Sequence, residues 1–354
     1  MTYAAGVLAV QYDAFGLMPY LTERADPIAP ANGVVIAVAA TGLCRSDWHG
    51  WQGHDSEIQT LPHVPGHEFA GTIAQVGDGI ANWQAGDRVT VPFVCGCGTC
   101  SECRSGNAQV CAAQWQPGFS GPGSFAQFVA IPNADFNLVA LPDDVTMAAA
   151  AGLGCRFATA FRAVTLIGRV QPGEQVVVLG CGGVGLSAVM IAAALGAEVT
   201  AVDMSAAALN MATEFGARYV VNSAGEHSVE QTIRELLTGG ADVTLDALGS
   251  IETARAAVAT LKPRGRHVQV GLLPPAEIGD RATVPMHLVI GRELQILGSH
   301  GMSARDYPAM LEMIATGTLN PQHLVTSTLG LAEAAAALAG LGNATNPGVS
   351  VITL

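Results

Sequence analysis

Five of the eight cysteines in this chain lie together in the stretch CGCGTCSECRSGNAQVC, which begins at Cys95. Clustered thiols of this kind can form a disulfide set, a redox pair or a metal site. Four of them follow the pattern C-x2-C-x2-C-x7-C, and Cys95 falls outside that series. Thiolates at this spacing can converge on one tetrahedral ion at about 2.3 Å, and four of them leave no coordination position open. The spacing therefore predicts a closed structural zinc cage, formed by Cys97, Cys100, Cys103 and Cys111.

Three other segments contain residue types that commonly bind zinc. Cys44 lies in GLCRSDWHG, His67 and Glu68 lie in VPGHEFAG, and Cys155 lies in GLGCRFATAF. Each of these residues, taken alone, is more often a buried core residue than a metal ligand. In combination, two thiolates and one imidazole leave a fourth coordination position open for water or an alcohol, which is typical of a catalytic zinc. The reactive site is therefore expected in these segments and not in the cysteine cluster.

A glycine-rich loop stands between an apolar strand and an apolar helix in VVVLGCGGVGLSAVMIAAALGAEVTAVD. Gly180, Gly182 and Gly185 form the pattern G-x-G-x-x-G, which permits a tight turn and a close approach of the backbone to a pyrophosphate. Asp203 follows at the end of the next strand, where a carboxylate binds adenosine ribose hydroxyls and repels a 2′-phosphate. The pattern predicts an NAD(H) site, and the alternative is a glycine turn without a ligand. We expect no chemical role for Cys181 inside the loop.

The strands and helices expected around these motifs follow two different patterns. Residues 34–139 consist of short β-rich runs separated by glycine and proline, which is typical of a mostly antiparallel, loop-rich unit. From about residue 156, strands alternate with alanine-rich helices, which predicts a parallel, doubly wound sheet of six strands. The segment after residue 299 has no place in that sheet and is expected to return to the first unit. We predict an α/β protein whose domains are 1–153 with 299–354, and 154–298.

Composition and charge limit the possible partners and the compartment. The 354 residues are 50% hydrophobic, which is ample for two cores, and the net charge of −13 comes without a basic patch. We therefore expect neither a nucleic-acid partner nor a membrane partner. No apolar run approaches the ~18 residues of a membrane span, and the N-terminal segment lacks a signal-type basic region. We expect a cytoplasmic protein, in which reduced thiols favour metal binding over disulfides.

Together these motifs resemble those of the zinc-dependent medium-chain alcohol dehydrogenases over nearly the whole chain. The resemblance implies a GroES-like catalytic domain built from both chain ends, a Rossmann NAD-binding domain between them and an active-site cleft where they meet. It also implies a homodimer or homotetramer that acts on a small alcohol, aldehyde or ketone. The matching residues are Cys44 with Ser46, Asp47 and His49; Gly66, His67 and Glu68; the four-cysteine segment; Cys155 with Thr159; and GCGGVG with Asp203.

The resemblance also implies roles for individual residues. Cys44, His67 and Cys155 would hold the catalytic zinc, with Glu68 behind it as a ligand that exchanges with water. Asp47 would orient the His67 imidazole. The alcohol oxygen would bind the zinc and lose its proton, and the carbinol hydride would pass reversibly to the nicotinamide. Ser46 would take the alcohol proton, which the nicotinamide ribose and His49 would relay to solvent.

Further residues are implied as cofactor contacts. Arg45 matches a position that contacts the pyrophosphate, Thr159 one that packs against the nicotinamide, and Leu272 a cofactor contact at a strand end. The remaining contacts belong to the glycine loop and the strand after it: Gly180, Gly182, Gly183, Val184, Gly185 and Asp203. One departure concerns the last strand, where Ile352 replaces an arginine that many relatives place on the cofactor phosphates.

The substrate class is less specific than the family. Aromatic residues border the zinc cleft in relatives and either line an apolar pocket or simply pack: Trp48, Trp51, Phe93 and Trp115. We expect primary or secondary alcohols of medium size. A polyol dehydrogenase is the alternative, although such enzymes often have glutamate in place of Cys155. Asp203 disfavours a cinnamyl-type NADP enzyme, and the complete ligand set disfavours both a zinc-free quinone reductase and a non-catalytic zinc or dinucleotide-binding protein.

Overall fold

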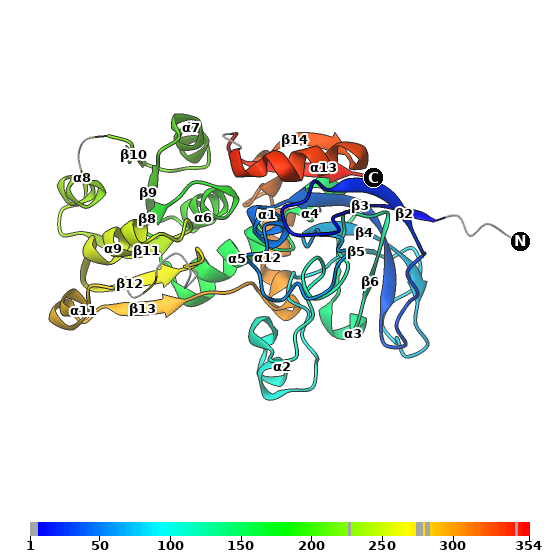
Figure 1. The fold of residues 1–354 in the computed structure, drawn as a ribbon. Coiled ribbons are helices and arrows are strands. Elements are labelled where there is room, and N and C mark those ends of the chain that lie inside the picture. Colours follow the sequence, from blue (N-terminus) through cyan, green and yellow to red (C-terminus); the bar gives the residue numbers. More distant parts are fainter. Residues whose placement is uncertain (1–5, 226–227, 274–278, 280–283, 344–345) are drawn as a thin grey trace, which may run out of the picture. The chain divides into compact units, whose positions relative to one another are not determined.

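The computed structural model describes residues 6–225, 228–273, 279, 284–343 and 346–354, which form two compact units. Unit 1 comprises Met1–Ala158, Gly301–Ala344 and Val349–Leu354, and unit 2 comprises Thr159–His300 and Thr345–Gly348. Both chain ends therefore contribute to unit 1 (Figure 1). One unit is rich in antiparallel strands and the other contains a doubly wound parallel sheet, so the predicted fold class is confirmed.

Unit 1 contains a two-stranded sheet, a seven-stranded sheet and short helices. Its strands are β1 (Val7–Gln11), β2 (Tyr20–Arg24), β3 (Val34–Leu43), β4 (Phe69–Val76), β5 (Arg88–Thr90), β6 (Phe128–Ile131), β7 (Val139–Ala140), β14 (Val325–Gly330) and β15 (Val349–Thr353). Its helices are α1 (Arg45–Trp51), α2 (Ser101–Ser105), α3 (Ala134–Asn137), α4 (Met147–Ala151), α12 (Tyr307–Ala315) and α13 (Leu331–Gly340), with α5 (Arg156–Arg162) crossing the unit boundary. Turns of 3-10 helix lie at Ala108–Val110, Ala304–Asp306, Pro321–Leu324 and Leu341–Asn343.

The long strand β3 is the centre of the seven-stranded sheet. The strand order is β14-β15-β3-β4-β5-β7, with β6 also paired to β3. β3 runs antiparallel to both β4 and β15, and Thr41 lies opposite Phe69 on β4. The ten residues of β3 are almost all apolar and mostly buried, and they pack with β4 in a core that includes Ile36, Phe69 and Ile73. Because the strands are antiparallel, the end of β3 lies beside the start of β4.

Unit 2 alternates strands and helices along the chain. Its strands are β8 (Gln175–Leu179), β9 (Glu198–Asp203), β10 (Tyr219–Asn222), β11 (Ala241–Asp246), β12 (Leu261–Gln269) and β13 (Gln295–Gly298). Its helices are α6 (Gly183–Ala194), α7 (Ala206–Glu214), α8 (Val229–Leu236), α9 (Ile251–Ala259) and α11 (Met286–Arg292), and a π-helical turn spans Ala163–Ile167. The six strands are all parallel, in the order β10-β9-β8-β11-β12-β13.

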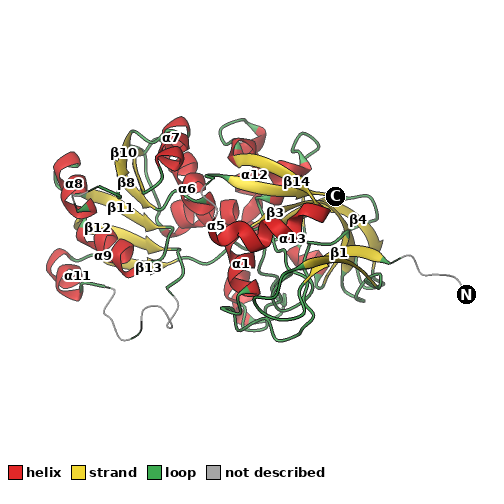
Figure 2. Ribbon diagram, turned by 45° about the horizontal axis from the view of Figure 1, so that its top comes forward, coloured by secondary structure: helices red, strands yellow, loops and turns green. Residues whose placement is uncertain are grey.

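Helices cover both faces of this parallel sheet. Helices α6 and α7 contact each other, and α9 contacts both α8 and α11, so that two helical layers enclose the strands (Figure 2). Burial on both faces explains why β8 reads as the nearly continuous apolar run QVVVL. The strand order reverses between β8 and β11, and open sheets of this type bind ligands at the carboxyl ends of the strands at such a reversal.

In the described parts of the chain, no helix has the length and apolar character needed to cross a lipid bilayer.

Candidate functional site

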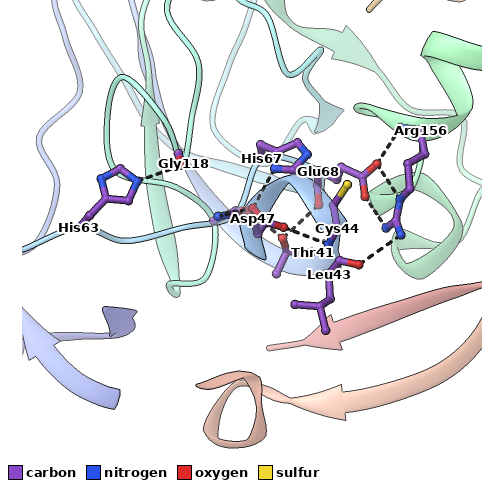
Figure 3. Close-up of polar contacts among 11 residues, drawn as sticks. Thr41, Leu43, Cys44, Asp47, His63, His67, Glu68, Gly118 and Arg156 are labelled. Carbon is purple, nitrogen blue, oxygen red and sulfur yellow. Dashed lines mark hydrogen bonds and ion pairs between the residues drawn. The ribbon is translucent and has the colours of Figure 1, made fainter. Parts of the chain in front are cut away.

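Four side chains gather in unit 1 at the points where β3 and β4 meet and where α5 begins. The ligand atoms of Cys44, His67, Glu68 and Cys155 all lie within 4.8 Å of one another. Cys44 is 5% exposed, His67 and Glu68 are completely buried, and Cys155 is half-buried. Figure 3 shows Cys44, His67 and Glu68 together, with Asp47 on the imidazole and Arg156 on the carboxylate.

The pairing of β3 with β4 explains why these distant residues meet. Cys44 follows the last residue of β3 and is the N-cap of α1, while His67 and Glu68 directly precede β4. The backbone N–H of Gly42 donates to the carbonyl oxygen of Glu68 over 2.7 Å, which continues the antiparallel pairing to the site. Cys155 directly precedes α5, and the backbone N–H of its neighbour Arg156 donates to Glu68 Oε1 over 2.7 Å.

Asp47 sets the orientation of the imidazole and of the first thiol. Its carboxylate is buried and accepts three hydrogen bonds, from His67 Nδ1 over 2.8 Å, from the Cys44 N–H over 3.0 Å and from the Gly66 N–H over 3.1 Å. The Nδ1 atom of His67 therefore carries a proton. Nε2 is buried and has no hydrogen-bond partner among the residues that the structure describes. A buried imidazole nitrogen without a partner, next to two thiols, fits a zinc ion.

The two thiols differ in their tendency to ionise. A hydrogen bond from Cys155 lowers the pKa of the Cys44 thiol well below its ordinary value. The same contact raises the pKa of Cys155, and burial adds to that effect. The contact between the two sulphurs therefore favours ionisation of Cys44 over that of Cys155. Because the thiolate is the form that binds a metal, the donor chemistry supports the same zinc assignment.

Glu68 has a partner that the sequence analysis did not single out. Arg156, which is 8% exposed, donates from Nε to Glu68 Oε1 over 3.0 Å and forms an ion pair with Oε2 through Nη2. Its Nη1 donates to the carbonyl oxygen of Leu43 over 3.2 Å. The sequence offered one signal for this role, an arginine next to Cys155, and nothing in the sequence indicated that this arginine is buried.

Two phenylalanines flank the imidazole of His67. The Phe93 ring centroid lies 6.1 Å from the His67 ring, nearly perpendicular to it, and the Phe119 centroid lies 5.1 Å away. Phe93 was one of the four aromatics expected near the site, whereas Phe119 lies in a loop without a motif and was missed. Trp51 packs in the apolar core and donates from Nε1 to the Leu17 carbonyl.

The other two tryptophans also have packing partners within unit 1. Trp115 is partly buried beside the core of the seven-stranded sheet, close to Gly121. Trp48 on α1 is partly buried against an apolar core of unit 1 and stacks edge-on against His49. Of the four aromatics, Phe93 is thus the one whose ring lies against the His67 ligand candidate.

The four cysteines of the predicted cage form a separate group. The Sγ atoms of Cys97, Cys100, Cys103 and Cys111 also lie within 4.8 Å of one another. Backbone N–H groups point at the sulphurs, because Cys97 Sγ accepts from Thr99 and Cys100 and Cys100 Sγ accepts from Cys103, each over 3.4 Å. Hydrogen bonds, led by the Thr99 hydroxyl, lower the pKa of Cys97 to about 5. This arrangement fits a closed tetrathiolate zinc cage.

Cys95 is not part of that group. Its side chain is 1% exposed within an apolar core, and its thiol contacts the Pro92 carbonyl oxygen over 3.7 Å. Burial raises the pKa of the thiol well above its ordinary value. Cys95 therefore lies in the core as an ordinary buried residue.

Helix α1 carries the candidate proton-relay residues. Ser46 and His49 are three residues apart and therefore lie on one face of the helix, where both are half-buried. His49 Nδ1 lies 3.1 Å from Nδ1 of His54, a histidine that the sequence analysis did not single out. At this distance one imidazole nitrogen can donate a hydrogen bond to the other, so His54 is a polar neighbour of His49.

Arg45 on the same helix has contacts within unit 1. Its guanidinium lies 4.5 Å from the centre of the Trp48 ring, and its Nη1 donates to the carbonyl oxygens of Leu341 and Gly342. The side chain is exposed. Because Nη1 already binds two carbonyl oxygens, the proposed contact with a cofactor pyrophosphate would require Arg45 to exchange these hydrogen bonds for bonds to the phosphate oxygens.

The glycine-rich loop of unit 2 has the shape expected of a phosphate-binding turn. Gly180 follows β8 with a φ of +88°, a conformation that favours glycine. A Cβ at Gly185 would overlap the carbonyl oxygen of Gly180, whereas a Cβ at Gly182 would meet no atom within 4 Å. Gly182 is the N-cap of α6, which Gly183 and Val184 begin, so open space lies at the positive end of the helix. These features fit a dinucleotide pyrophosphate.

Asp203 lies next to this loop at the end of β9. Its Oδ2 accepts from the Cys181 N–H over 2.7 Å, and its Oδ1 accepts from the Ser205 N–H over 2.8 Å. The carboxylate is only partly buried, which leaves oxygen lone pairs for further donors. The Cys181 thiol is buried, and burial raises its pKa to about 12, so no chemistry is indicated for it.

The other predicted cofactor contacts are more scattered. Thr159 is buried, and its hydroxyl has no hydrogen-bond partner in the described part of the chain. Leu272 follows the carboxyl end of β12 and is 65% exposed. Ile352 is completely buried in β15 and belongs to the apolar core of unit 1, so this position contributes packing and no charge.

Comparisons with known proteins agree with this geometry. Residues 30–143 match the family described as alcohol dehydrogenase GroES-like domain, and residues 183–316 match the family described as zinc-binding dehydrogenase. The chain is 32% identical over 329 residues to an NAD-dependent alcohol dehydrogenase of Sulfurisphaera tokodaii, covering 90% of this chain and 92% of that protein. It is 31% identical over 316 residues to a sorbitol dehydrogenase of Halalkalibacterium halodurans, covering 88% and 89%. The solved structure of alcohol dehydrogenase TADH from Thermus sp. ATN1 aligns with a TM-score of 0.87 at 28% identity, covering 98% and 99%.

Proposed function

This chain belongs to the zinc-dependent medium-chain alcohol dehydrogenase family, and we propose that it oxidises primary or secondary alcohols reversibly with NAD. The observation that carries the proposal is the donor set of Cys44, His67 and Cys155. It offers two sulphurs and an unpartnered, buried imidazole nitrogen, while the nearby carboxylate of Glu68 is bound by Arg156. Three ligands and one free position are typical of a catalytic zinc.

The chain's own residues hold and orient the reacting groups. Zinc held by Cys44, His67 and Cys155 would supply a Lewis acid that lowers the pKa of the alcohol, and NAD would supply the hydride acceptor. Asp47 keeps the proton of His67 on Nδ1, so that Nε2 remains a ligand. Phe93 and Phe119 flank the imidazole, which is completely buried. We propose that Ser46 takes the alcohol proton and that His49 passes it toward solvent.

The cofactor preference follows from unit 2. The open space at Gly182 and the N-terminus of α6 would receive the pyrophosphate, and the Asp203 carboxylate would accept hydrogen bonds from the adenosine ribose. A 2′-phosphate would meet the negative charge of Asp203, so we propose NAD over NADP. The second metal, in the four-cysteine cage, would be structural because four thiolates leave no position for a substrate.

The test combines metal analysis with turnover. Protein purified without added metal should contain two zinc ions per chain and should reduce NAD with an alcohol from a panel of straight-chain, branched, aromatic and polyol substrates. Cys155→Ser should abolish turnover and retain the zinc of the four-cysteine cage. A single zinc ion and no turnover with any alcohol in wild-type protein would contradict the proposal.

A polyol substrate is the second candidate, because a sorbitol dehydrogenase is among the similar proteins. The same panel separates the two. Turnover confined to polyols would favour this candidate, whereas turnover of simple alcohols would favour the first.

A further inference from the structure

The buried ion pair between Glu68 and Arg156 has a consequence for the metal site beside it. Both oxygens of Glu68 are bound by Arg156, Oε1 by the backbone N–H and by Nε, and Oε2 by Nη2. Glu68 is completely buried and Arg156 nearly so. A Cβ at Gly42 would lie 2.5 Å from Glu68 Oε2 and 2.7 Å from Arg156 Nη2. A glycine on β3 therefore provides the space that the pair occupies.

The same carboxylate is within reach of the metal ligands. An oxygen of Glu68 lies within 4.8 Å of the ligand atoms of Cys44, His67 and Cys155, so that Glu68 could complete a tetrahedron around a bound ion. Four protein ligands would close the site, as they do in structural zinc sites. The carboxylate thus has two alternative cationic partners, the guanidinium and the metal.

We propose that Arg156 is a positioning residue that keeps Glu68 off the metal and so leaves the fourth coordination position open for the substrate oxygen. The inference rests on the proposed function, because it assumes a metal held by Cys44, His67 and Cys155. A buried carboxylate that loses its partner is strongly destabilised. Without Arg156, the metal is the nearest cation that Glu68 can bind.

A cobalt-substituted protein tests this proposal without relying on activity. Imidazole serves as the probe, because it changes the visible spectrum only of cobalt that has an exchangeable position, and the four-cysteine cage has none. In Arg156→Met, the imidazole concentration at half-saturation should rise about tenfold or more, the size of effect usual for residues that support metal ligands. In Arg156→Met/Glu68→Gln, the response should return close to that of the wild type, because the competing carboxylate is gone.

A matched control is Arg88→Met, because Arg88 is also partly buried in unit 1 and donates to the backbone carbonyls of Pro142 and Val145, neither of which is a candidate ligand. It should leave the imidazole response unchanged. An Arg156→Met protein with the wild-type response, or a double variant that responds as weakly as the single variant, would overturn the proposal. A wild-type protein that binds no cobalt outside the cage would instead refute the proposed function.

Arg156→Met/Glu68→Gln keeps the proposal testable if Arg156→Met does not fold, because neither charge of the pair is then left buried without its partner. We expect this double variant to bind cobalt at the Cys44 site within about threefold of the wild-type affinity, because Glu68 is not a ligand while Arg156 holds it, whereas loss of a ligand or its support costs 10-fold to 100-fold. A tenfold loss of cobalt affinity in the double variant would show that the carboxylate is a resting ligand and would overturn the proposal.

Discussion

Replacing Asp47 by asparagine should weaken one metal site and spare the other. In the structure, Asp47 Oδ1 accepts hydrogen bonds from His67 Nδ1 and from the Gly66 N–H, and Oδ2 accepts from the Cys44 N–H. Both oxygens of Asp47 face N–H donors, and asparagine has one oxygen and one N–H2 group. The N–H2 group of the asparagine must therefore face one of these donors. If the N–H2 group faces Cys44, the start of α1 loses its cap. If it faces His67, the imidazole must move its proton to Nε2, where the metal would bind.

The expected size of the effect follows from these contacts. Loss of a residue that hydrogen-bonds a metal ligand typically weakens metal affinity by about 10-fold to 100-fold, or ~1.4 to ~2.8 kcal/mol. We expect the upper half of this range. The substitution removes the negative charge that supports the basicity of His67, and it also places a donor against a donor in a site where Asp47 and His67 are both buried.

The assay is a competition for zinc between the protein and a coloured chelator, with native mass spectrometry to count the ions per chain. The four-cysteine cage does not include Asp47 and serves as an internal control, so one zinc should dissociate more readily and one should not. Asp143→Asn, at a fully exposed carboxylate, is the matched control and should change neither site. A folded Asp47→Asn protein that holds both ions as the wild type does, or that loses both equally, would refute the reasoning.

Four further predictions concern the cofactor, the cage, a buried histidine and the relay. Asp203→Ala should shift the ratio of kcat/KM for NAD over NADP toward NADP by about tenfold, equivalent to ~1.4 kcal/mol, because it removes the charge that repels a 2′-phosphate; an unchanged ratio would argue against this role. Cys103→Ser should lose the cage zinc and lower Tm, because metal binding contributes to folding. Metal analysis and thermal unfolding would contradict this prediction if the variant kept two zinc ions and the wild-type Tm. Burial lowers the pKa of His267, so the unfolded chain takes up a proton below pH ~6.5 that the folded protein does not, and the free energy of unfolding falls as the pH drops from about 7 to 5. His267→Gln should make this fall shallower in denaturant titrations, and an equal slope in both proteins would be inconsistent with the burial effect. His49→Gln should slow turnover most at low pH, and pH–rate profiles that coincide with the wild type would count against a proton relay through His49.

The parts of the protein that rest on local chain geometry could be predicted from the sequence. The four cysteines of the predicted cage lie within one short segment, so local turns of the chain are enough to bring their sulphurs together. The glycine loop is likewise defined by its neighbours along the chain, because a strand, a tight turn and a helix N-terminus follow one another directly. The alternation of strands and helices fixed the parallel sheet for the same reason, since each connection must cross the sheet.

Contacts between segments that are distant along the chain could not be predicted from the sequence. Residue types suggested that Cys44, His67 and Cys155 belong together, but the pairing of β3 with β4 is what places the first two side by side. The sequence could not show that Phe119 lies against His67 or that Trp51 lies in an apolar core. An aromatic side chain packs equally well in a core and in a pocket, so its residue type does not distinguish the two environments.

The clearest division is at Glu68. The sequence by itself determined which donors the chain possesses, that they divide into a compact cysteine cage and a dispersed set, and that a dinucleotide-type sheet accompanies them. Only the tertiary structure decided that the Glu68 carboxylate has Arg156 as its partner and that one buried carboxylate, Asp47, binds His67 Nδ1 together with the N–H groups of Cys44 and Gly66. Charge pairing inside a protein depends on which side chains are buried together, and burial is set by the packing of strands and helices that lie far apart in the sequence.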